Sequence, residues 1–516
     1  MSLLDSVEDF RGLYGLSEEE LGALCAELRE RILDVTLKNG GHLSSSLGAV
    51  ELTVALLRVF NPDSDKIIFD VGHQSYAYKL LTKRLDRFPT LRRKGGIAGF
   101  PRMDESPYDF FTTGHSSTSI SAAMGYAKAR DLKRESYEVV AVIGDGALLN
   151  GVSFEALNAM TSVKSKVIIV LNDNKMSINP RVGGMASHLA KLAVNPTYKK
   201  FKDYVKYQCA GRRNGESVHQ ALSQIKQKLK SLLLPTNIFE ELNISYWGPF
   251  NGHNVTEMEE VFRLARHYDE PLLIHVLTQK GKGYQSGFVA ILGRPNVGKS
   301  TLMNALVGEK VAITSARAQT TRSRIMGVMT RENLQIVFLD TPGVHHPRNK
   351  LGEYMMSAVK DALDGVDAVI VMLDATDVRP TDIEIIRKYD ALGVKCALVV
   401  NKIDLVNSDT LAPLLDKLSV EKADAFIPIS AQKKNGLDRL VKVLQGWMPE
   451  GPQYFPDDMI TDQPERVIVA EMIREKALRN LRDEIPHGIG VEVLAMENQG
   501  DERRAVTIHA NIFCER

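Results

Sequence analysis

One short stretch has the residue types and the spacing of a phosphate-binding loop. It runs from Gly293 to Ser300 and reads G-R-P-N-V-G-K-S, which matches the pattern G-x-x-x-x-G-K-[ST]. An apolar run at 288–292 precedes it, and a plausible helix at 301–306 follows it. A strand, a glycine turn and a helix N-terminus direct several backbone N–H groups at one point, which suits a phosphate. The pattern predicts that Lys299 reaches the β- and γ-phosphates of a nucleotide and that Ser300 ligates Mg²⁺.

Three later stretches, each after an apolar run, indicate which nucleotide is bound. Asp340 ends one run, where a carboxylate is placed to hold Mg²⁺ through water. Asn401-Lys402-Ile403-Asp404 ends the second, and the Asp404 carboxylate can accept from both N1–H and the 2-amino group of guanine. Adenine lacks this donor pair, so GTP is favoured over ATP. Ser430-Ala431 follows the third run, in a loop of the kind that commonly packs behind the nucleotide base. The preceding runs are 334–339, 396–400 and 426–429.

These motifs carry a family resemblance. Together with Gln319-Thr320-Thr321-Arg322 and Asp340–Gly343, they make residues 287–450 similar to the G domain of the Era family of bacterial GTPases. The resemblance implies a P-loop α/β domain in which Thr321 closes on Mg²⁺ and the γ-phosphate, so that Lys299 and Thr321 are the catalytic residues. It also implies that Asn296 helps to bind K⁺, a hypothesis that equal turnover in KCl and NaCl would refute. The predicted nucleotide-binding residues are Gly293, Asn296, Val297, Gly298, Lys299, Ser300, Thr301, Asp340, Gly343, Asn401, Lys402, Asp404, Ser430 and Ala431, with Ser300 and Thr321 on the metal.

A second constellation lies in the first half of the chain. One apolar run ends in Gly144-Asp145-Gly146, and the next ends in Asn172-Asp173-Asn174. Asp145 and Asn174 have the spacing by which thiamine diphosphate enzymes hold a divalent metal. A carboxylate and an amide oxygen are hard ligands that suit Mg²⁺, and the glycine after Asp145 lets the backbone approach a diphosphate. The alternative left open by these residues alone is a pair of acidic strand-end turns without a ligand.

Further motifs of the first half match one family: Gly41-His42-Leu43, Asp70–Gln74, Gly114-His115-Ser116, Gly144–Ala147, Asn172–Ile178 and Lys280–Tyr284. Through them, residues 1–284 resemble the N-terminal part of 1-deoxy-D-xylulose-5-phosphate synthase, a transketolase-like enzyme. That family condenses pyruvate with glyceraldehyde 3-phosphate on thiamine diphosphate, in the isoprenoid and thiamine precursor pathway.

The resemblance implies a role for each matching residue. His42 and His73 face the reactive end of the cofactor as catalytic residues, although His42 taken alone is better explained as a capping or packing residue. Asp145 and Asn174 ligate Mg²⁺. The cofactor-binding residues that the resemblance implies are His73, Gly114, His115, Ser116, Gly146, Ala147, Asn174 and Tyr284.

The match to the synthases ends abruptly. The family continues with a pyrimidine-binding domain whose glutamate engages the aminopyrimidine ring, whereas only Gln285-Ser286-Gly287 separates Tyr284 from the GTPase pattern. We therefore expect a diphosphate–Mg²⁺ half-site with little or no synthase activity. Two alternatives stay open: a synthase completed by another chain, and a fused or misassembled gene product without a physiological role.

The last part of the chain suggests a partial RNA-binding domain. A helix is predicted at 463–483, and a hairpin at 490–496 and 505–514 turns at Asn498–Asp501. This order resembles the start of the KH domain of Era, and the sequence stops before the G-x-x-G loop that clamps RNA. We expect this segment to be poorly stable and to bind small-subunit ribosomal RNA weakly. The basic stretch at 199–230 is interpreted as a solvated face rather than an RNA surface.

Composition is that of an ordinary globular protein. The 516 residues are 44% hydrophobic and 25% charged with a net charge of +1, which gives no global attraction to nucleic acid or membrane. The four cysteines are scattered, which suits a reducing cytoplasm and argues against a zinc site. No apolar run approaches the ~20 residues of a membrane span, and the N-terminus has no signal segment, so we expect a cytoplasmic protein. The oligomeric state is left open.

The elements that must position these residues follow the α/β pattern. Periodic apolar residues predict a helix at 18–37, started by a Ser17/Glu20 capping box, and a second helix at 51–60. Strands are predicted at 67–69 and 109–113, besides the apolar runs at 138–143 and 167–171. The predicted domains are 1–285 (a transketolase-like parallel-sheet domain that binds thiamine diphosphate), 286–450 (a P-loop GTPase domain) and 451–516 (a linker and a partial α+β KH domain).

Overall fold

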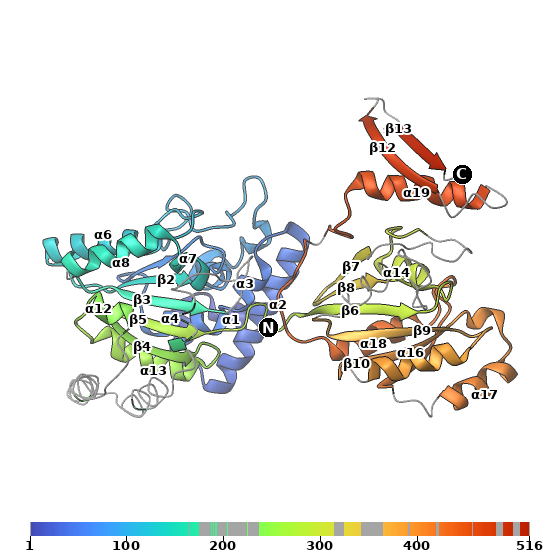
Figure 1. The fold of residues 1–516 in the computed structure, drawn as a ribbon. Helices are drawn as coiled ribbons and strands as arrows, with labels where there is room; N and C mark the ends of the chain where they lie inside the picture. Colours follow the sequence, from blue (N-terminus) through green and yellow to red (C-terminus); the bar gives the residue numbers. More distant parts are fainter. Residues whose placement is uncertain are drawn as a thin grey trace. The chain divides into compact units, whose positions relative to one another are not determined.

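The chain divides into two compact units, residues 1–283 and 284–516, in a computed structural model (Figure 1). The structure describes residues 2–163, 165–174, 187, 189, 191–192, 204, 224, 237–313, 325–341, 365–390, 393–418, 423–456, 458–480, 489–498 and 506–514. Among these residues, no helix has the length and apolar character needed to cross a membrane.

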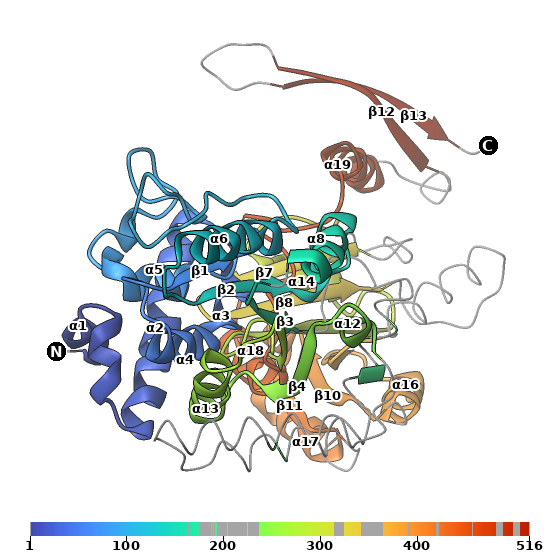
Figure 2. The same cartoon turned by 90° about the vertical axis from the view of Figure 1, so that its left-hand side faces the viewer.

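The first unit is built on a five-stranded parallel sheet with the order β1-β2-β3-β5-β4. The central strands are continuous apolar runs, as expected for strands that helices cover on both faces. Figures 1 and 2 show α6 and α8 on one face and α4 and α13 on the other. The strands are β1 (Lys66–Phe69), β2 (Val139–Gly144), β3 (Ile168–Asp173), β4 (Ser245–Asn251) and β5 (Leu272–Leu277).

The helices of this unit confirm the periodicity of the sequence. The Ser17–Glu20 capping box is present at the start of α2, with both reciprocal hydrogen bonds formed. The helices and turns are α1 (Leu3–Val7), η1 (Phe10–Gly15), α2 (Glu18–Asn39), α3 (Leu43–Leu47), α4 (Val50–Val59), α5 (Tyr76–Lys79), η2 (Leu80–Arg84), η3 (Phe88–Thr90), α6 (Ser119–Lys133), α7 (Asp145–Leu148), α8 (Gly151–Val163), α12 (Ile238–Glu241) and α13 (Val255–Arg266).

The predicted strand at 109–113 is wrong, because these residues form no strand. The Asp109 carboxylate accepts hydrogen bonds from two guanidinium nitrogens of Arg84 at 2.6 and 3.0 Å and from the Arg102 backbone N–H at 2.9 Å. The Phe110 carbonyl accepts from the Tyr126 hydroxyl at 2.7 Å. The Tyr126 side chain thus satisfies a backbone carbonyl that a neighbouring strand would otherwise pair, and the Asp109 carboxylate fixes the start of the segment to Arg84 and Arg102.

The second unit contains a six-stranded sheet with the order β11-β10-β9-β6-β8-β7, in which only β7 is antiparallel to its neighbour. Helices α14 and α18 pack on one face, and α16 and α17 pack on the other. The elements are β6 (Gln285–Gly293), α14 (Lys299–Val307), β7 (Ile325–Arg331), β8 (Leu334–Asp340), β9 (Ala368–Asp374), α16 (Pro380–Asp390), β10 (Lys395–Asn401), η4 (Ile403–Leu405), α17 (Ser408–Leu418), β11 (Ala425–Pro428) and α18 (Leu437–Trp447).

The segment after α18 packs along this sheet before the last elements begin. The Gln335 side chain donates to the Phe455 carbonyl at 2.9 Å, and the Val328 N–H donates to the Ile460 carbonyl at 2.8 Å. The predicted helix and hairpin are confirmed as α19 (Glu465–Asn480) and the antiparallel pair β12 (Ile489–Asn498) and β13 (Val506–Cys514).

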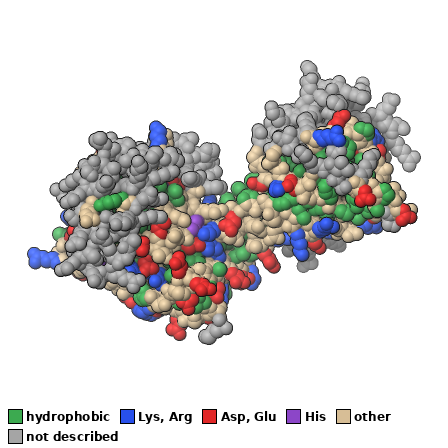
Figure 3. Space-filling model, turned by 90° about the horizontal axis from the view of Figure 1, so that it is seen from below, with side chains coloured by type: hydrophobic (Ala, Val, Ile, Leu, Met, Phe, Trp, Pro, Cys, Tyr) green, Lys and Arg blue, Asp and Glu red, His purple; other side chains and the backbone are tan. Residues whose placement is uncertain are grey.

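The interpretation of the basic stretch at 199–230 as a solvated face stays a prediction, because all but two of its residues lie outside the described ones. On the face drawn in Figure 3, Lys and Arg side chains are interspersed with Asp and Glu side chains over the described residues. This mixture agrees with a net charge of +1.

A buried charge cluster gives the first unit a testable weak point. The Asp109 carboxylate is fully buried beside Arg84, and Lys79 lies within 3.9 Å of it. Removing one member of a buried ion pair costs about 3–5 kcal/mol, because the partner charge stays buried. We expect Asp109→Asn to lower the unfolding free energy of the first unit by about 3 kcal/mol, measured by calorimetry of the full chain.

The matched control is Asp104→Asn, since the Asp104 side chain is 66% exposed and pairs with the surface residue Arg102. It should leave the transition in place. A first-unit transition that is equally stable in both variants would contradict the structural role of the cluster.

Candidate functional site

The loop between β6 and α14 has the backbone that its glycines permit. Gly293 has a φ of 147°, and a Cβ added there would lie 2.6 Å from the Met372 carbonyl oxygen. Gly298 has a φ of 104°, and a Cβ there would lie 2.3 Å from the Asn401 amide nitrogen. Both positions therefore require glycine on two counts, conformation and space.

Lys299 lies across this loop. Its ammonium donates to the carbonyls of Gly293 and Arg294, each at 3.1 Å, and its side chain is buried. Burial lowers the pKa of Lys299 to about 8, against the opposing effect of the Asp340 charge. Among the described residues this buried cation bonds carbonyls alone, so a phosphate oxygen at the mouth of the loop would stabilise it.

Ser300, a predicted metal ligand, contacts Asp340, which was predicted to hold the metal through water. The Ser300 hydroxyl donates to Asp340 Oδ2 at 2.6 Å. Asp340 is fully buried, and this burial raises the pKa of its carboxyl group. Its Oδ1 atom has no hydrogen-bond partner among the described residues. A hydroxyl beside a buried carboxylate with an unsatisfied oxygen is a donor set that fits Mg²⁺ and its water ligands.

Asn401 links the loops on the guanine side. Its amide nitrogen donates to the Val297 carbonyl at 2.9 Å, and its amide oxygen accepts from the Ala431 N–H at 2.9 Å. The Ser430 hydroxyl accepts from the Lys433 N–H at 3.1 Å, which closes the loop that contains Ser430 and Ala431. Asp404 is exposed on the turn η4, two residues after a Lys402 with a φ of 66°. The structure thus brings the phosphate loop, Asn401 and Ala431 into contact.

The remaining predicted residues of this site divide into two groups. Asn296 is exposed, Val297 is buried, and Thr301 is half-buried on α14. Thr321 and Gly343 lie outside the described residues, so their roles stay predictions.

In the first unit, the predicted metal ligands follow neighbouring strands. β2 and β3 are parallel with Gly144 opposite Asn172, so Asp145 and Asn174 both follow at the same edge of the sheet. Asp145 is buried at the start of α7, whereas Gly146 is exposed and Ala147 half-buried. A carboxylate and an amide gathered at one edge match the donors that Mg²⁺ prefers.

The two predicted catalytic histidines lie together. Their ring centroids are 6.1 Å apart, and the His42 ring stacks on Phe100 at 5.3 Å. Burial lowers the pKa of both rings, that of His73 to about 4, and the positive charge of Lys280 acts in the same direction on each. His73 Nδ1 is buried without a hydrogen-bond partner among the described residues. A neutral imidazole with an unsatisfied nitrogen fits a polar group of a bound cofactor.

The Gly114–Ser116 loop is anchored by a carboxylate. Asp70 accepts from the N–H groups of Ser117 and Ser119 at 2.8 and 3.0 Å, and so occupies the N-terminus of α6. Gly114, His115 and Ser116 themselves are exposed just before this anchor. Asp70 belongs to the motif Asp70–Gln74 that matches the synthase family, but no role at the site was predicted for it.

Tyr284 has a different setting from the other predicted cofactor residues. It is the first residue of the second unit and is fully buried there, and its carbonyl accepts from the Gly451 N–H at 2.8 Å. Its role toward a cofactor stays a prediction.

Buried amides at the strand ends were missed by sequence reasoning. Asn172 donates to the Gln74 side chain at 3.0 Å and accepts from the Thr278 hydroxyl at 2.5 Å. Asp173 pairs with His275 at 3.1 Å, and His275 bonds the Tyr246 hydroxyl at 2.7 Å. These contacts join β3 to β4, to β5 and to the segments that follow β1 and β5. No local pattern could have paired residues so far apart in the chain.

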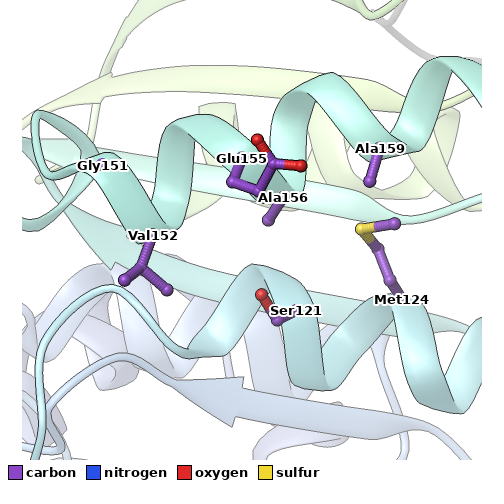
Figure 4. A pocket seen from close by; sticks show the side chains of 7 residues that line it. All are labelled: Ser121, Met124, Gly151, Val152, Glu155, Ala156 and Ala159. Carbon is purple, nitrogen blue, oxygen red and sulfur yellow. The ribbon is translucent and has the colours of Figure 1, made fainter.

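A hollow of about 430 Å³ lies between α6 and α8 (Figure 4). None of the predicted site residues contributes to its wall, so it adds no group to either site. The residues that line it are Ser121, Met124, Gly151, Val152, Glu155, Ala156 and Ala159.

Two family models match the chain. One described as 1-deoxy-D-xylulose-5-phosphate synthase matches residues 4–278, and one described as a 50S ribosome-binding GTPase matches residues 288–402.

Curated relatives cover the first part. The 1-deoxy-D-xylulose-5-phosphate synthase of Clostridium beijerinckii is 49% identical over 284 residues, which are 55% of this chain and 46% of the relative. That of Desulfitobacterium hafniense is 50% identical over 286 residues, which are 55% of this chain and 45% of the relative. The chain thus spans less than half the length of these curated relatives.

Solved structures cover the second part. Era in complex with MgGDPNP and nucleotides 1506–1542 of 16S ribosomal RNA is 40% identical, with 45% of this chain and 80% of that chain covered and a TM-score of 0.42. An Era variant from Aquifex aeolicus bound to GDP and AlF4⁻ has the same identity and coverage, with a TM-score of 0.43.

The buried His73 makes the first unit sensitive to acid. Its pKa falls from 6.5 to about 4 on folding, so protonation favours the unfolded chain. The stability that comes from a neutral His73 is present above pH 6.5 and is lost as the pH falls toward 4. We expect His73→Gln to flatten the fall in the thermal midpoint of the first unit over this range.

The exposed His115 provides the matched control, because His115→Gln removes a ring of the same kind from the surface. That variant should follow the parent chain. Identical pH profiles for the His73 variant and the parent would refute the buried neutral state.

Proposed function

The chain belongs to the 1-deoxy-D-xylulose-5-phosphate synthase family through residues 4–278, and we propose that its second unit, an Era-like GTPase domain, binds and hydrolyses GTP. The observation that carries the proposal is the meeting of three loops around Asn401. This side chain bonds the phosphate loop at Val297 and the base-backing loop at Ala431. Such a contact sets the distance between the phosphate end and the guanine end of one nucleotide.

Each residue of the site has a distinct task in the proposed reaction. Lys299 neutralises charge on the β- and γ-phosphates, and a phosphate beside the buried ammonium would offset the desolvation that lowers its pKa. Ser300 and Thr321 would ligate Mg²⁺, and Asp340 would hold it through water. The metal supplies charge stabilisation as water attacks the γ-phosphate. Asn296 is proposed to contribute to a K⁺ site beside the phosphates.

Guanine is selected by Asp404. Its carboxylate accepts two hydrogen bonds from N1–H and the 2-amino group, whereas adenine presents no matching pair. The exposed position of Asp404 on η4 leaves both oxygens accessible to a base.

The first unit supports a second function, the binding of thiamine diphosphate with Mg²⁺. The specific observation is the unsatisfied, buried Nδ1 of His73 beside His42. Asp145 and Asn174 would hold the metal, and Gly114–Ser116, Gly146 and Ala147 would contact the cofactor. When bound, the cofactor supplies a carbanion that attacks a 2-oxo acid; the protein keeps both imidazoles neutral and able to accept a proton. Because the match spans less than half of the relatives, we propose that this unit alone has little or no synthase activity.

RNA binding is proposed for the last elements. Era was solved with a segment of 16S ribosomal RNA, and α19 with β12 and β13 follows the G domain in this chain as well. We propose a weak interaction of this segment with small-subunit ribosomal RNA.

Replacing Asp404 tests the proposed function directly. Asp404→Ala removes two hydrogen bonds to a charged acceptor, which costs roughly 3 kcal/mol, or about a hundredfold in the Kd for GTP. Equilibrium titration of the full chain with a fluorescent GTP analogue in Mg²⁺ measures the loss.

The control is Glu332→Ala, which removes an exposed carboxylate from the turn between β7 and β8. It should bind GTP as the parent chain does. A Kd for GTP in the Asp404 variant equal to that of the parent chain would contradict the assignment of the guanine site.

A further inference from the structure

The loop that connects β9 to α16 contacts the phosphate-binding loop through Arg294. We use the name β9–α16 loop for residues 374–382, which run from the last residue of β9 through the connection to the first turn of α16. Arg294 Nε donates to Asp382 Oδ1 at 2.7 Å, and Arg294 Nη2 donates to the Asp377 carbonyl at 2.5 Å. The Asp382 side chain is fully buried, and that of Arg294 is 13% exposed. A largely desolvated ion pair therefore fixes one variable position of the phosphate-binding motif.

The same loop contacts the guanine-reading segment through Lys402. The Lys402 ammonium bonds Asp374 Oδ2 at 2.5 Å, and the side chain of Asp374 is 12% exposed. Asp374 Oδ1 accepts from the backbone and the hydroxyl of Thr376 at 3.0 and 2.7 Å. The Ala375 N–H donates to the Asn401 carbonyl at 2.9 Å, so backbone and side chain both join β9 to the end of β10.

Internal hydrogen bonds hold the β9–α16 loop in one shape. The Asp377 N–H donates to the Asp374 carbonyl at 3.1 Å, which closes a turn. The Arg379 N–H donates to Asp382 Oδ2 at 2.9 Å, and the Asp382 N–H returns a bond to the Arg379 carbonyl at 3.0 Å. The two carboxylates at its ends are thus set at fixed places relative to each other.

We propose that Asp374 and Asp382 are positioning residues for guanine nucleotides: Asp382 aligns the phosphate-binding loop through Arg294, and Asp374 aligns the guanine-reading segment through Lys402. The inference rests on the proposed GTP site and deepens it. Neither carboxylate touches the nucleotide. Each acts by holding a neighbour that does, or that lies in a loop that does.

The two residues have different consequences for specificity. Asp404 lies two residues after Lys402, and its two hydrogen bonds to guanine need a fixed orientation of that turn. Loss of Asp374 frees the turn and weakens the contact with the 2-amino group. Loss of Asp382 moves the phosphate loop, which GDP and IDP use equally, since IDP differs only in lacking that amino group.

The test compares GDP with IDP in titrations of the full chain with Mg²⁺. We expect Asp374→Asn to raise the Kd for GDP about tenfold and to lower the preference for GDP over IDP about fivefold. We expect Asp382→Asn to raise both Kd values about tenfold, to leave the preference unchanged, and to keep the thermal unfolding midpoint of the parent, so that a smaller folded fraction does not explain the loss. The matched control is Asp438→Asn, since that side chain is 93% exposed on α18, and it should bind both nucleotides as the parent does.

The outcomes separate this inference from the proposed function. If the parent chain binds no GDP, both the proposed function and the positioning role are wrong. A parent chain that binds GDP, together with Asp374 and Asp382 variants within about twofold of it, overturns the positioning role alone. Equal weakening of GDP and IDP by Asp374→Asn also overturns it for Asp374, because a smaller folded fraction lowers both affinities in proportion.

Discussion

Both candidate sites depend on one constraint, that parallel strands in a sheet all end at the same edge. In the first unit this constraint brings Asp145 and Asn174 to the ends of adjacent strands. In the second unit it brings the phosphate loop after β6, Asp340 after β8 and Asn401 after β10 to one edge. A binding site at such an edge needs few residues from each strand, because the polar residues at the ends of neighbouring parallel strands lie close together.

The edges are held by amides and carboxylates that bond each other. Asn401 connects two loops in the second unit, and Asn172 connects Gln74 with Thr278 in the first. Buried polar groups of this kind are costly unless every member is satisfied, so a satisfied set fixes one arrangement of the loops. What stays unsatisfied is then informative. His73 Nδ1 and Asp340 Oδ1 are such atoms among the described residues, and each lies where a ligand is proposed.

The sequence was sufficient where local signals decide the structure. The strand-end motifs, the Ser17–Glu20 capping box and the final hairpin all follow from periodicity, caps and turns, and the structure has them. The sequence was insufficient where contacts between residues far apart in the chain decide the structure. The segment 109–113 has a strand-like composition, yet Arg84 and Tyr126 satisfy its polar groups from elsewhere in the chain. The contact between Asp374 and Lys402 is equally invisible, although Asp374 ends an apolar run just as Asp340 does.

Nucleotide chemistry is therefore assigned to a site that the second unit builds from its own strand ends, and the synthase-like unit has a separate sheet edge of its own. Calorimetric titration of the full chain with GDP and with ADP in Mg²⁺ tests this most directly. If this assignment is right, we expect one GDP per chain and no measurable heat from ADP. Absence of GDP binding, or binding of ADP with comparable affinity, would contradict it.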